Sequence, residues 1–286
     1  MFHAAIADTT SDEISDHIVH GAALPDSGDA ESLQPGETVL QVSALTAPSV
    51  QKSQPLHALN FDVRAGESLG LAGVWGNGQV ELVECLAGLR AISGGTVHPG
   101  GCDITGTSAL VRRHTGLAYV SADPSHEGLK PESSIRTNVI AGSHHSAPIA
   151  RGGILNPAAM RRVAGESLNK LKVKSGTLGD PVSSLSGGNQ QKLVFAREIA
   201  GAPKRLIASQ PTRGVDLGSI AAIHALIRKF ARSGGAVLLA TEELDELVSL
   251  STRVIVLSGG AQVGEVQASE GRMQDIGRMK VQGVAA

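Results

Sequence analysis

The stretch Gly73-Val-Trp-Gly-Asn-Gly-Gln-Val80 decides how the chain should fold, because its glycines have the spacing of a phosphate-binding loop. Gly73 and Gly78 bracket four residues, as they do in the pattern G-x-x-x-x-G-K-[ST]. The lysine position of that pattern holds Gln79, and the hydroxyl position holds Val80. The sequence therefore keeps the backbone of a phosphate loop and lacks its charge and its Mg²⁺ ligand.

The residues on either side of the glycines supply the context that such a loop requires. Ser68-Leu-Gly-Leu-Ala-Gly73 is a short apolar run, which is typical of a parallel strand buried on both faces. After the loop, apolar residues recur at helical spacing at Val80, Leu82, Val83, Leu86 and Leu89. This order predicts a loop that joins the end of a buried strand to the start of a helix.

The rest of the chain alternates between strand-like and helix-like segments. The expected strands are 37–45, 59–63, 95–98, 117–121, 204–209, 236–240, 253–257 and 262–266. The expected helices are 157–171, 189–200, 217–233 and 243–249, whereas residues 122–157 are expected to be mostly irregular. Such an alternation predicts an α/β fold with a largely parallel sheet that is covered on both faces.

Composition limits the classes of function that the chain can have. Its 286 residues fit one large domain, or one domain with appendages. A formal net charge of -2 gives no electrostatic reason to expect a nucleic-acid partner. No apolar run approaches the roughly 20 residues of a membrane span, and no secretory signal is visible. We therefore expect a cytoplasmic location, with any membrane contact made through a partner.

The cysteines, the histidines and the paired arginines are interpreted as structural or surface groups. Cys85 and Cys102 form neither a C-x-x-C motif nor a metal-binding spacing, so reduced thiols are expected. The ten histidines, which include His144-His145, show no H-x-x-x-H pattern, so surface positions are expected and no metal site is predicted. Arg112-Arg113 is interpreted as a pair of solvated charges on a helix.

Residues 1 to about 36 are acidic and rich in Ser, Asp and Gly. The segment 9–19 is compatible with one short helix, in which Ser11 would cap the first turn. The remainder of this region has the composition of a flexible linker.

Leu185-Ser-Gly-Gly-Asn-Gln-Gln-Lys192 is the most specific stretch in the chain, and it resembles the signature sequence of ABC-type ATPases. Further along, Gln210-Pro-Thr-Arg-Gly-Val-Asp216 is similar to the segment that follows the acidic strand in that family. The order of motifs matches the family across residues 37–280. The resemblance implies a nucleotide-binding domain of the P-loop NTPase type, with an antiparallel β subdomain and a helical subdomain at about 122–200. Residues 281–286 would be a tail.

The form of the motifs also resembles one branch of the family. The loop followed by Glu81-Leu-Val83, and the Gly-Gly-Asn-Gln-Gln form of the signature, look like the second nucleotide-binding half of tandem importers for simple sugars and nucleosides. The acidic start resembles the connector that precedes such a second half. This implies an assembly with another nucleotide-binding half and with membrane permease subunits, on the inner face of the membrane.

Set against the family pattern, the chain's own site is degenerate. The aspartate and glutamate that end the acidic strand are replaced by Ser209 and Gln210, and the switch histidine falls on Glu242. The family's glutamine after Val120 has no clear counterpart and is placed near Ala122 or Asp123. No aromatic residue lies between Phe2 and Phe61, where one that stacks on adenine would be expected. Because phosphoryl transfer depends on placed charge, we expect no useful hydrolysis here, and we assign no catalytic or metal-ligating residue.

The two loops still predict two sets of nucleotide contacts. Any weak binding of ATP at the chain's own loop would use Gly73, Gly76, Asn77, Gly78, Gln79 and Val80. In the family each site is composite, so the signature would meet the partner's ATP, and Mg²⁺ would enter only at that site. The residues expected to face the partner's ATP are Ser186, Gly187, Gly188, Asn189 and Asp216.

Several other functions are compatible with parts of the sequence. One is a self-sufficient ABC ATPase with unusual site residues, and another is a non-hydrolytic binding or regulatory module. A dinucleotide oxidoreductase is disfavoured, because Gly70, Gly73 and Gly76 do not form G-x-G-x-x-G. A DNA-repair ABC ATPase is disfavoured by the near-neutral charge and by the lack of a coiled-coil insertion.

Overall fold

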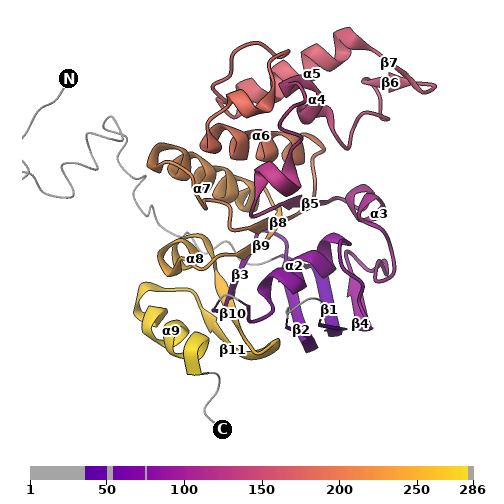
Figure 1. The fold of residues 1–286 in the computed structure, drawn as a ribbon. Coiled ribbons are helices and arrows are strands. Elements are labelled where there is room, and N and C mark those ends of the chain that lie inside the picture. The colour runs from indigo at the N-terminus through magenta and orange to yellow at the C-terminus, as the bar shows by residue number, and fades with distance from the viewer. Residues whose placement is uncertain (1–35, 50–53, 75, 283–286) are drawn as a thin grey trace, which may run out of the picture.

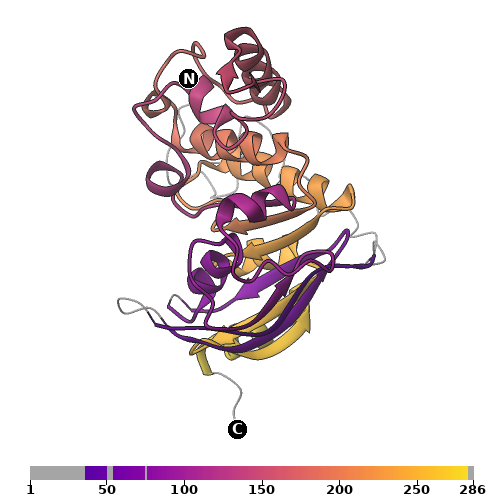
Figure 2. The ribbon, with the colours of Figure 1, turned by 90° about the vertical axis from the view of Figure 1, so that its right-hand side faces the viewer.

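The computed structural model describes residues 36–49, 54–74 and 76–282. Figures 1 and 2 show a lower part built from two sheets and an upper part built from helices. Almost all of the expected acidic linker at 1–36, its short helix and most of the expected tail at 281–286 lie outside the described residues.

The larger sheet has six strands in the order β11-β10-β3-β9-β8-β5. Its five strands from β10 to β5 run parallel, and β11 pairs antiparallel with β10. The strands are β3 (Ser68–Ala72), β5 (Leu117–Val120), β8 (Arg205–Ser209), β9 (Ala236–Ala240), β10 (Arg253–Ser258) and β11 (Ala261–Gln267). Strands β3, β8 and β9 are buried at every residue, which explains why their sequences are apolar runs without alternation.

A second, antiparallel sheet has the order β2-β1-β4 and packs beside the larger one. Its strands are β1 (Thr38–Ala47), β2 (Leu56–Arg64) and β4 (Gly94–His98). The side chains of β1 alternate between buried and more exposed positions, as expected for a strand with one face on the core.

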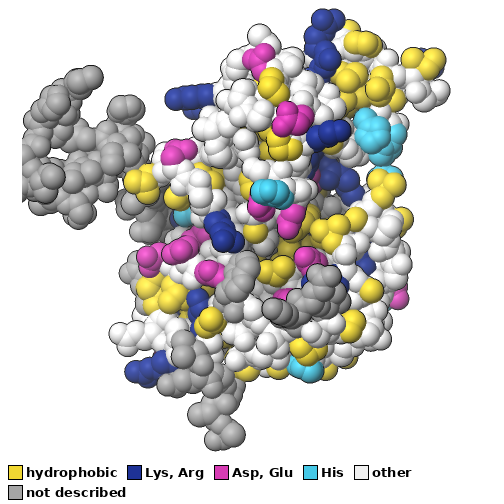
Figure 3. Space-filling view, in the orientation of Figure 1, with side chains coloured by type: hydrophobic (Ala, Val, Ile, Leu, Met, Phe, Trp, Pro, Cys, Tyr) yellow, Lys and Arg dark blue, Asp and Glu magenta, His cyan; other side chains and the backbone are white. Residues whose placement is uncertain are grey.

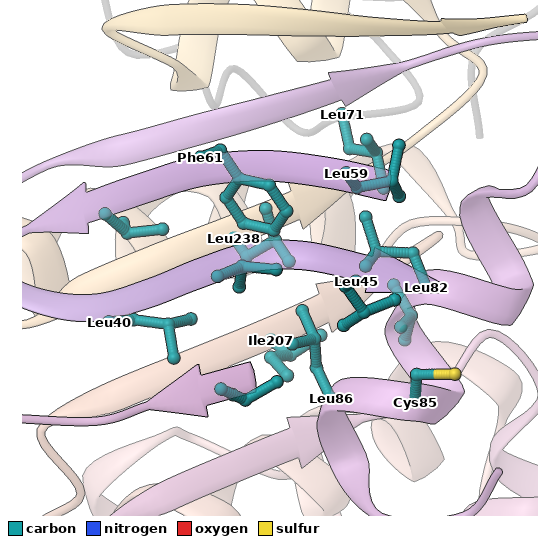
Figure 4. Close-up of a cluster of buried hydrophobic side chains, with 14 of the residues drawn as sticks. Leu40, Leu45, Leu59, Phe61, Leu71, Leu82, Cys85, Leu86, Ile207 and Leu238 are labelled. Carbon is teal, nitrogen blue, oxygen red and sulfur yellow. The ribbon is translucent and has the colours of Figure 1, made fainter. Parts of the chain in front are cut away.

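One hydrophobic core joins the two sheets around helix α2 (Gln79–Ala87). Figure 4 shows Leu45 and Leu59 of the antiparallel sheet close to Leu82 and Leu86 of the helix, with Leu238 of the larger sheet nearby. All five side chains are almost completely buried. This core fixes the position of the helix that follows the glycine loop.

The upper part contains three helices that pack on one another: α4 (Ile135–Ile140), α5 (Pro157–Lys170) and α6 (Gly187–Ala200). A second hydrophobic cluster holds them against β5, β8 and α7 (Leu217–Arg232). The predicted α/β fold is therefore confirmed: it has a mostly parallel sheet, a separate antiparallel sheet and a group of packed helices.

The expectation of mostly irregular structure over 122–157 is wrong in part. Residues Pro124–Gly128 form one π-helical turn, which Asp123 caps by accepting bonds from two backbone amides. Helix α4 follows, capped by Ser134, and then a small hairpin of β6 (Ala150–Arg151) and β7 (Ile154–Leu155). These elements are too short to show a periodic pattern, so their sequence carried little signal.

The remaining helices cover the lower part. Helix α8 (Leu244–Leu250) and α9 (Met273–Gln282) pack with β10 in a third cluster, and α3 (Ala109–His114) lies beside β5. In the described part of the chain, no helix is long and apolar enough to span a membrane. Lys and Arg side chains are scattered among acidic ones on the face shown in Figure 3, rather than gathered in one patch.

The interpretation of Arg112 as a solvated charge is wrong. Its side chain is only 1 % exposed, and its guanidinium donates to the carbonyl oxygens of Cys85, Leu86, Thr105 and Thr107. It thereby joins the end of α2 to the segment before α3. Arg113 is partly exposed and pairs with Glu198 of α6 at 2.6 Å.

Candidate functional site

The loops that follow three neighbouring parallel strands meet in one small hollow. These loops follow β3, β8 and β9, so their meeting point lies at the carboxyl edge of the sheet, where open α/β sheets usually bind ligands. The hollow has a volume of about 20 Å³, which is room for a water molecule. Its lining consists of Gly76, Gln79, Val80, Ser209, Gln210, Ala240, Thr241 and Glu242. The structure thus brings together the five substituted positions of the family pattern: Gln79, Val80, Ser209, Gln210 and Glu242.

The glycine loop has the backbone of a phosphate-binding loop. Gly76 and Gly78 have φ values of 84° and 105°, in the left-handed region that favours glycine. Gly78 is the N-cap of α2 and makes no side-chain cap, so the first amides of this helix are presented without a capping side chain. A backbone of this shape favours an anion.

The side chain of Gln79 bridges this loop. Its Nε2 donates to the carbonyl oxygen of Val74 at 3.2 Å. A Cβ at Gly73 would collide with the amide of Gln79, so the side chain folds into the space that the glycine leaves. The loop therefore has an internal neutral bridge at the position where a phosphate loop has a lysine.

The side chain of Asn77, which was expected to contact nucleotide, instead bonds to the turn between β10 and β11. Its Oδ1 accepts from the amide of Gly259 at 2.9 Å, and its carbonyl oxygen accepts from the amide of Gly260 at 3.0 Å. Both glycines lie in the turn between β10 and β11. Asn77 thus anchors the glycine loop to the C-terminal hairpin.

The other side of the hollow is formed by the ends of β8 and β9. Ser209 is buried at the last residue of β8, opposite Ala240 in β9. Gln210 follows in a left-handed conformation, and its amide donates to the carbonyl oxygen of Ala240 at 2.7 Å. Glu242 is exposed, and Lys280 of α9 donates to its backbone carbonyl oxygen at 3.0 Å.

These groups do not fit a Mg²⁺-triphosphate. Val80 has only methyl groups where a metal-ligating hydroxyl is needed, and Gln79 carries no charge. Gln210 cannot accept a proton, and Glu242, which also lines the hollow, brings a negative charge that would repel phosphate. The residues can offer hydrogen bonds to an anion or to water, but not the charge placement that phosphoryl transfer depends on.

Glu246 is a buried carboxylate that the sequence analysis did not single out, and it stabilises the loops that line the hollow. Glu246 of α8 accepts from Thr241 at 2.6 Å, from Thr212 at 2.8 Å and from His224 Nε2 at 2.9 Å. Burial tends to raise the pKa of Glu246, but the bonds from His224, Thr241 and Thr212 outweigh it, so the pKa is lowered. The carboxylate holds the loops after β8 and β9 against α7. The only sequence signal for Glu246 was its spacing of four residues from Glu242.

The signature residues lie at the start of α6, outside the lining of the hollow. Ser186 is the N-cap, but its hydroxyl does not cap the helix and instead accepts from Nδ2 of Asn189 at 2.9 Å. Ser186 and Gly187 are exposed, whereas Gly188 is buried. An uncapped helix start with an exposed hydroxyl is suited to an external anion.

Asp216 lies directly against the signature. It is the N-cap of α7 and accepts from the amide of Ser219 at 2.9 Å. A Cβ at Gly188 would lie 2.5 Å from Oδ2 of Asp216 and from the hydroxyl of Ser219. Burial tends to raise the pKa of Asp216, but the bonds from Ser219 and the charge of Lys192 outweigh it, so the pKa is lowered. The structure therefore joins two stretches that the sequence identified separately.

The segment after β5 is also tied to α6. Asp123 is exposed and caps the π-helical turn, and Ser125 in that turn donates to Oε1 of Gln190 at 3.0 Å. Neither Ala122 nor Asp123 lines the hollow. The position of the family's glutamine therefore stays a prediction.

The comparisons with known proteins agree with this architecture. A family model described as "ABC transporter" matches residues 56–213, which include the glycine loop, the signature and the end of β8. The chain belongs to the ABC transporter family. Residues 214–282, with Asp216 and the strands that complete the sheet, follow this matched region.

Two curated relatives are importers' ATP-binding proteins. The guanosine import ATP-binding protein of Bacillus subtilis is 33 % identical over 272 residues, covering 95 % of this chain and 53 % of the relative. The ribose import ATP-binding protein of Corynebacterium glutamicum is 33 % identical over 269 residues, covering 94 % of this chain and 50 % of the relative. The chain therefore spans about half the length of the curated relatives it matches.

Solved structures share the fold at lower sequence identity. A nucleotide-free ATP-binding cassette from an ABC transporter aligns with a TM-score of 0.71 at 19 % identity, covering 84 % of this chain and 95 % of that one. A dimeric cassette in a post-hydrolysis state with ADP and Pi aligns with a TM-score of 0.69 at 20 % identity, covering 80 % and 99 % of the two chains. At this level of identity the likeness concerns the fold alone.

Proposed function

We propose that this chain is a nucleotide-binding half of an ABC importer whose own ATP site is degenerate. It would act with a second, competent half and with membrane permease subunits, on the cytoplasmic face of the membrane. The assembled transporter would hydrolyse ATP at the partner's site, and this chain would complete that site with its signature. One observation carries this proposal. The hollow lacks the charged groups that phosphoryl transfer needs, whereas the start of α6 is exposed and has no side-chain cap.

The composition of the hollow supports the first part of the proposal. Gln79 replaces a charge that would contribute about 1.5–3 kcal/mol to a phosphate contact, and it bridges the loop instead. Ser209 and Gln210 supply neither a metal-binding carboxylate at the end of β8 nor a base for water, and the negative charge of Glu242 would repel phosphate. Binding of nucleotide at this loop is weak or absent, and hydrolysis there is not expected.

The signature supports the second part. Ser186 and Gly187 are exposed at an uncapped helix start, while Asp216 packs behind Gly188 and holds the segment in place. Such a helix end presents backbone amides and one hydroxyl toward an incoming phosphate. The Ser186 hydroxyl would orient the partner's ATP, and Mg²⁺ would enter with that ATP rather than at this chain's hollow.

The names of the relatives support the class of solute. They are importers' ATP-binding proteins for guanosine, nucleosides, ribose and glucose. We propose nucleosides or simple sugars as the transported class. The solute itself would be selected by the permease and its binding protein.

The test uses the chain purified together with its competent half and permease in lipid. Ser186→Arg places a bulky cation at an exposed position, so folding should be retained while ATP turnover of the assembly is lost. The matched control is Ser184→Arg, which alters an exposed residue two positions earlier. Unchanged turnover in Ser186→Arg, or turnover by the isolated chain that stops with Gly78→Asp, would overturn the proposal.

A further inference from the structure

Histidine side chains that are distant in the sequence gather at one edge of the molecule. Figure 3 shows a compact group of His side chains on the right-hand edge of the face, near α3 and the β6–β7 hairpin. His114 ends α3, whereas His144 and His145 lie in the turn after α4. The ring centroids of His114 and His145 are 5.6 Å apart, and those of His144 and His145 are 5.1 Å apart. The sequence had given no reason to connect them.

Two ring nitrogens in this group lie as far apart as two ligands of the same metal ion. Nε2 of His114 lies 3.3 Å from Nε2 of His145. Two nitrogens bound at 2.0–2.1 Å to one tetrahedral Zn²⁺ are separated by about 3.3–3.4 Å. The two imidazoles therefore already have the separation of two ligands on one edge of a zinc tetrahedron.

We propose that His114 and His145 form a binding site for a transition-metal ion, with Zn²⁺ as the ion that fits best. Imidazole nitrogen is a preferred ligand of Zn²⁺, Cu²⁺ and Ni²⁺, and Zn²⁺ accepts a tetrahedral set. The ion takes the place of the shared proton between the two rings. His144 supplies the third nitrogen by rotation of its exposed side chain, and water supplies the fourth ligand.

The backbone on both sides of the site is held in place. Thr115 caps the end of α3 by donating to the carbonyl oxygen of Arg112 at 2.7 Å. In the facing turn, the amides of Ser143 and Ser146 donate to the carbonyl oxygens of Ile140 and Ser143 at 3.0 Å. Only side-chain rotation is therefore needed to close the site.

The positive charge of Arg113, which precedes His114 in the chain, is already paired. Arg113 lies against Gly142 in the turn after α4, but its guanidinium pairs with Glu198 at 2.6 Å.

In the part of the chain that the structure describes, no three His, Cys, Asp or Glu side chains already stand in position around one ion. Two preset ligands and one that must rotate should bind the ion more weakly than a fully preset set of ligands. The bound ion joins α3 to the turn after α4.

The site is tested by calorimetric titration of the untagged chain with zinc chloride, with thermal unfolding as the second readout. The wild type is expected to bind one Zn²⁺ and to melt at a higher temperature with zinc. His114→Ala and His145→Ala should each weaken binding at least tenfold, and His144→Ala should weaken it less. His57→Ala, which removes an exposed histidine of β2, is the matched control and should change nothing.

Two results would overturn the site. One is zinc binding that is unchanged in the double variant of His114 and His145. The other is binding that disappears with Cys102→Ser, since Cys102 is an exposed free thiol elsewhere on the surface. The melting temperatures of all variants without zinc show whether each has kept its fold. The replaced histidines are exposed, so no loss of folding is expected.

Discussion

Gln79 donates from Nε2 to the carbonyl oxygen of Val74 at 3.2 Å, so the first residue of α2 closes the loop that precedes its own helix. This bond depends on Gly73, because a Cβ at that residue would occupy the space of the Gln79 amide. The loop keeps its left-handed glycines and its uncapped helix start, but a neutral side chain spans it. The substitution at position 79 therefore changes both the charge and the openness of the loop.

The first prediction is that Gln79→Lys strengthens nucleotide binding by the isolated chain. A charged contact to phosphate contributes about 1.5–3 kcal/mol, which corresponds to roughly a tenfold to hundredfold lower Kd. Titration with a fluorescent ATP analogue measures this. ATP turnover should stay absent, because Gln210 still cannot accept a proton. Gln79→Ala is the control, since it opens the bridge without adding charge, and equal binding by both variants would contradict the role assigned to charge.

The second prediction concerns the contact between the signature and Asp216. Gly188→Ala should lower the free energy of unfolding by about 1–3 kcal/mol, because its Cβ would press on the Asp216 carboxylate and on Ser219. Gly187→Ala is the neighbouring control. Its Cβ would lie 3.4 Å from the carbonyl oxygen of Gly214, an ordinary contact, so little change is expected. Urea denaturation distinguishes them, and equal losses would show that Asp216 does not restrict this position.

The sequence predicted the elements whose pattern is set by burial. The apolar runs of β3, β8 and β9 needed no alternation because both faces are covered, and they were placed within a residue. Helix α6 begins at Gly187 rather than Asn189, since the two glycines already belong to its first turn. The short helix α4 was not predicted, because six residues show no clear period.

Substitutions at the hollow were visible in the sequence, whereas the contacts around it were not. The departures at Gln79, Ser209 and Glu242 were visible against a family pattern, and the topology brings them together. The bonds that Asn77 accepts from the β10–β11 turn come from residues 182 and 183 positions away, which no local pattern reports. The same holds for Glu246, whose three donors come from separate elements.

The third prediction is that Glu246 makes stability depend on pH. Its pKa is lowered in the folded protein, so its stabilising effect is present above its ordinary value near 4.5 and is lost as the pH falls through the folded value. Glu246→Gln should therefore cost about 1–3 kcal/mol at pH 7 and less near pH 4. Urea unfolding of both proteins at the two pH values measures the difference. A cost that is the same at both would mean that the carboxylate charge is unimportant.

The fourth prediction is that Arg112 is required for stability, although the sequence suggested a solvated charge. Arg112→Ala should lower the free energy of unfolding by about 3 kcal/mol or more, because four backbone carbonyl oxygens each lose a donor and each buried group left unpaired costs about 1–3 kcal/mol. Arg112→Lys should recover only part of this, since one ammonium cannot reproduce the planar arrangement of guanidinium donors.

Arg161 provides the matched control for this prediction, because it is exposed on α5. Arg161→Ala should change the free energy of unfolding by no more than about 0.5 kcal/mol. Urea denaturation of the three variants beside the wild type decides the matter. If Arg112→Ala and Arg161→Ala behave alike, the guanidinium of Arg112 does not hold the end of α2 to the segment before α3. A large loss in Arg112→Ala alone would show that an arginine whose sequence context suggests a solvated charge can be structural.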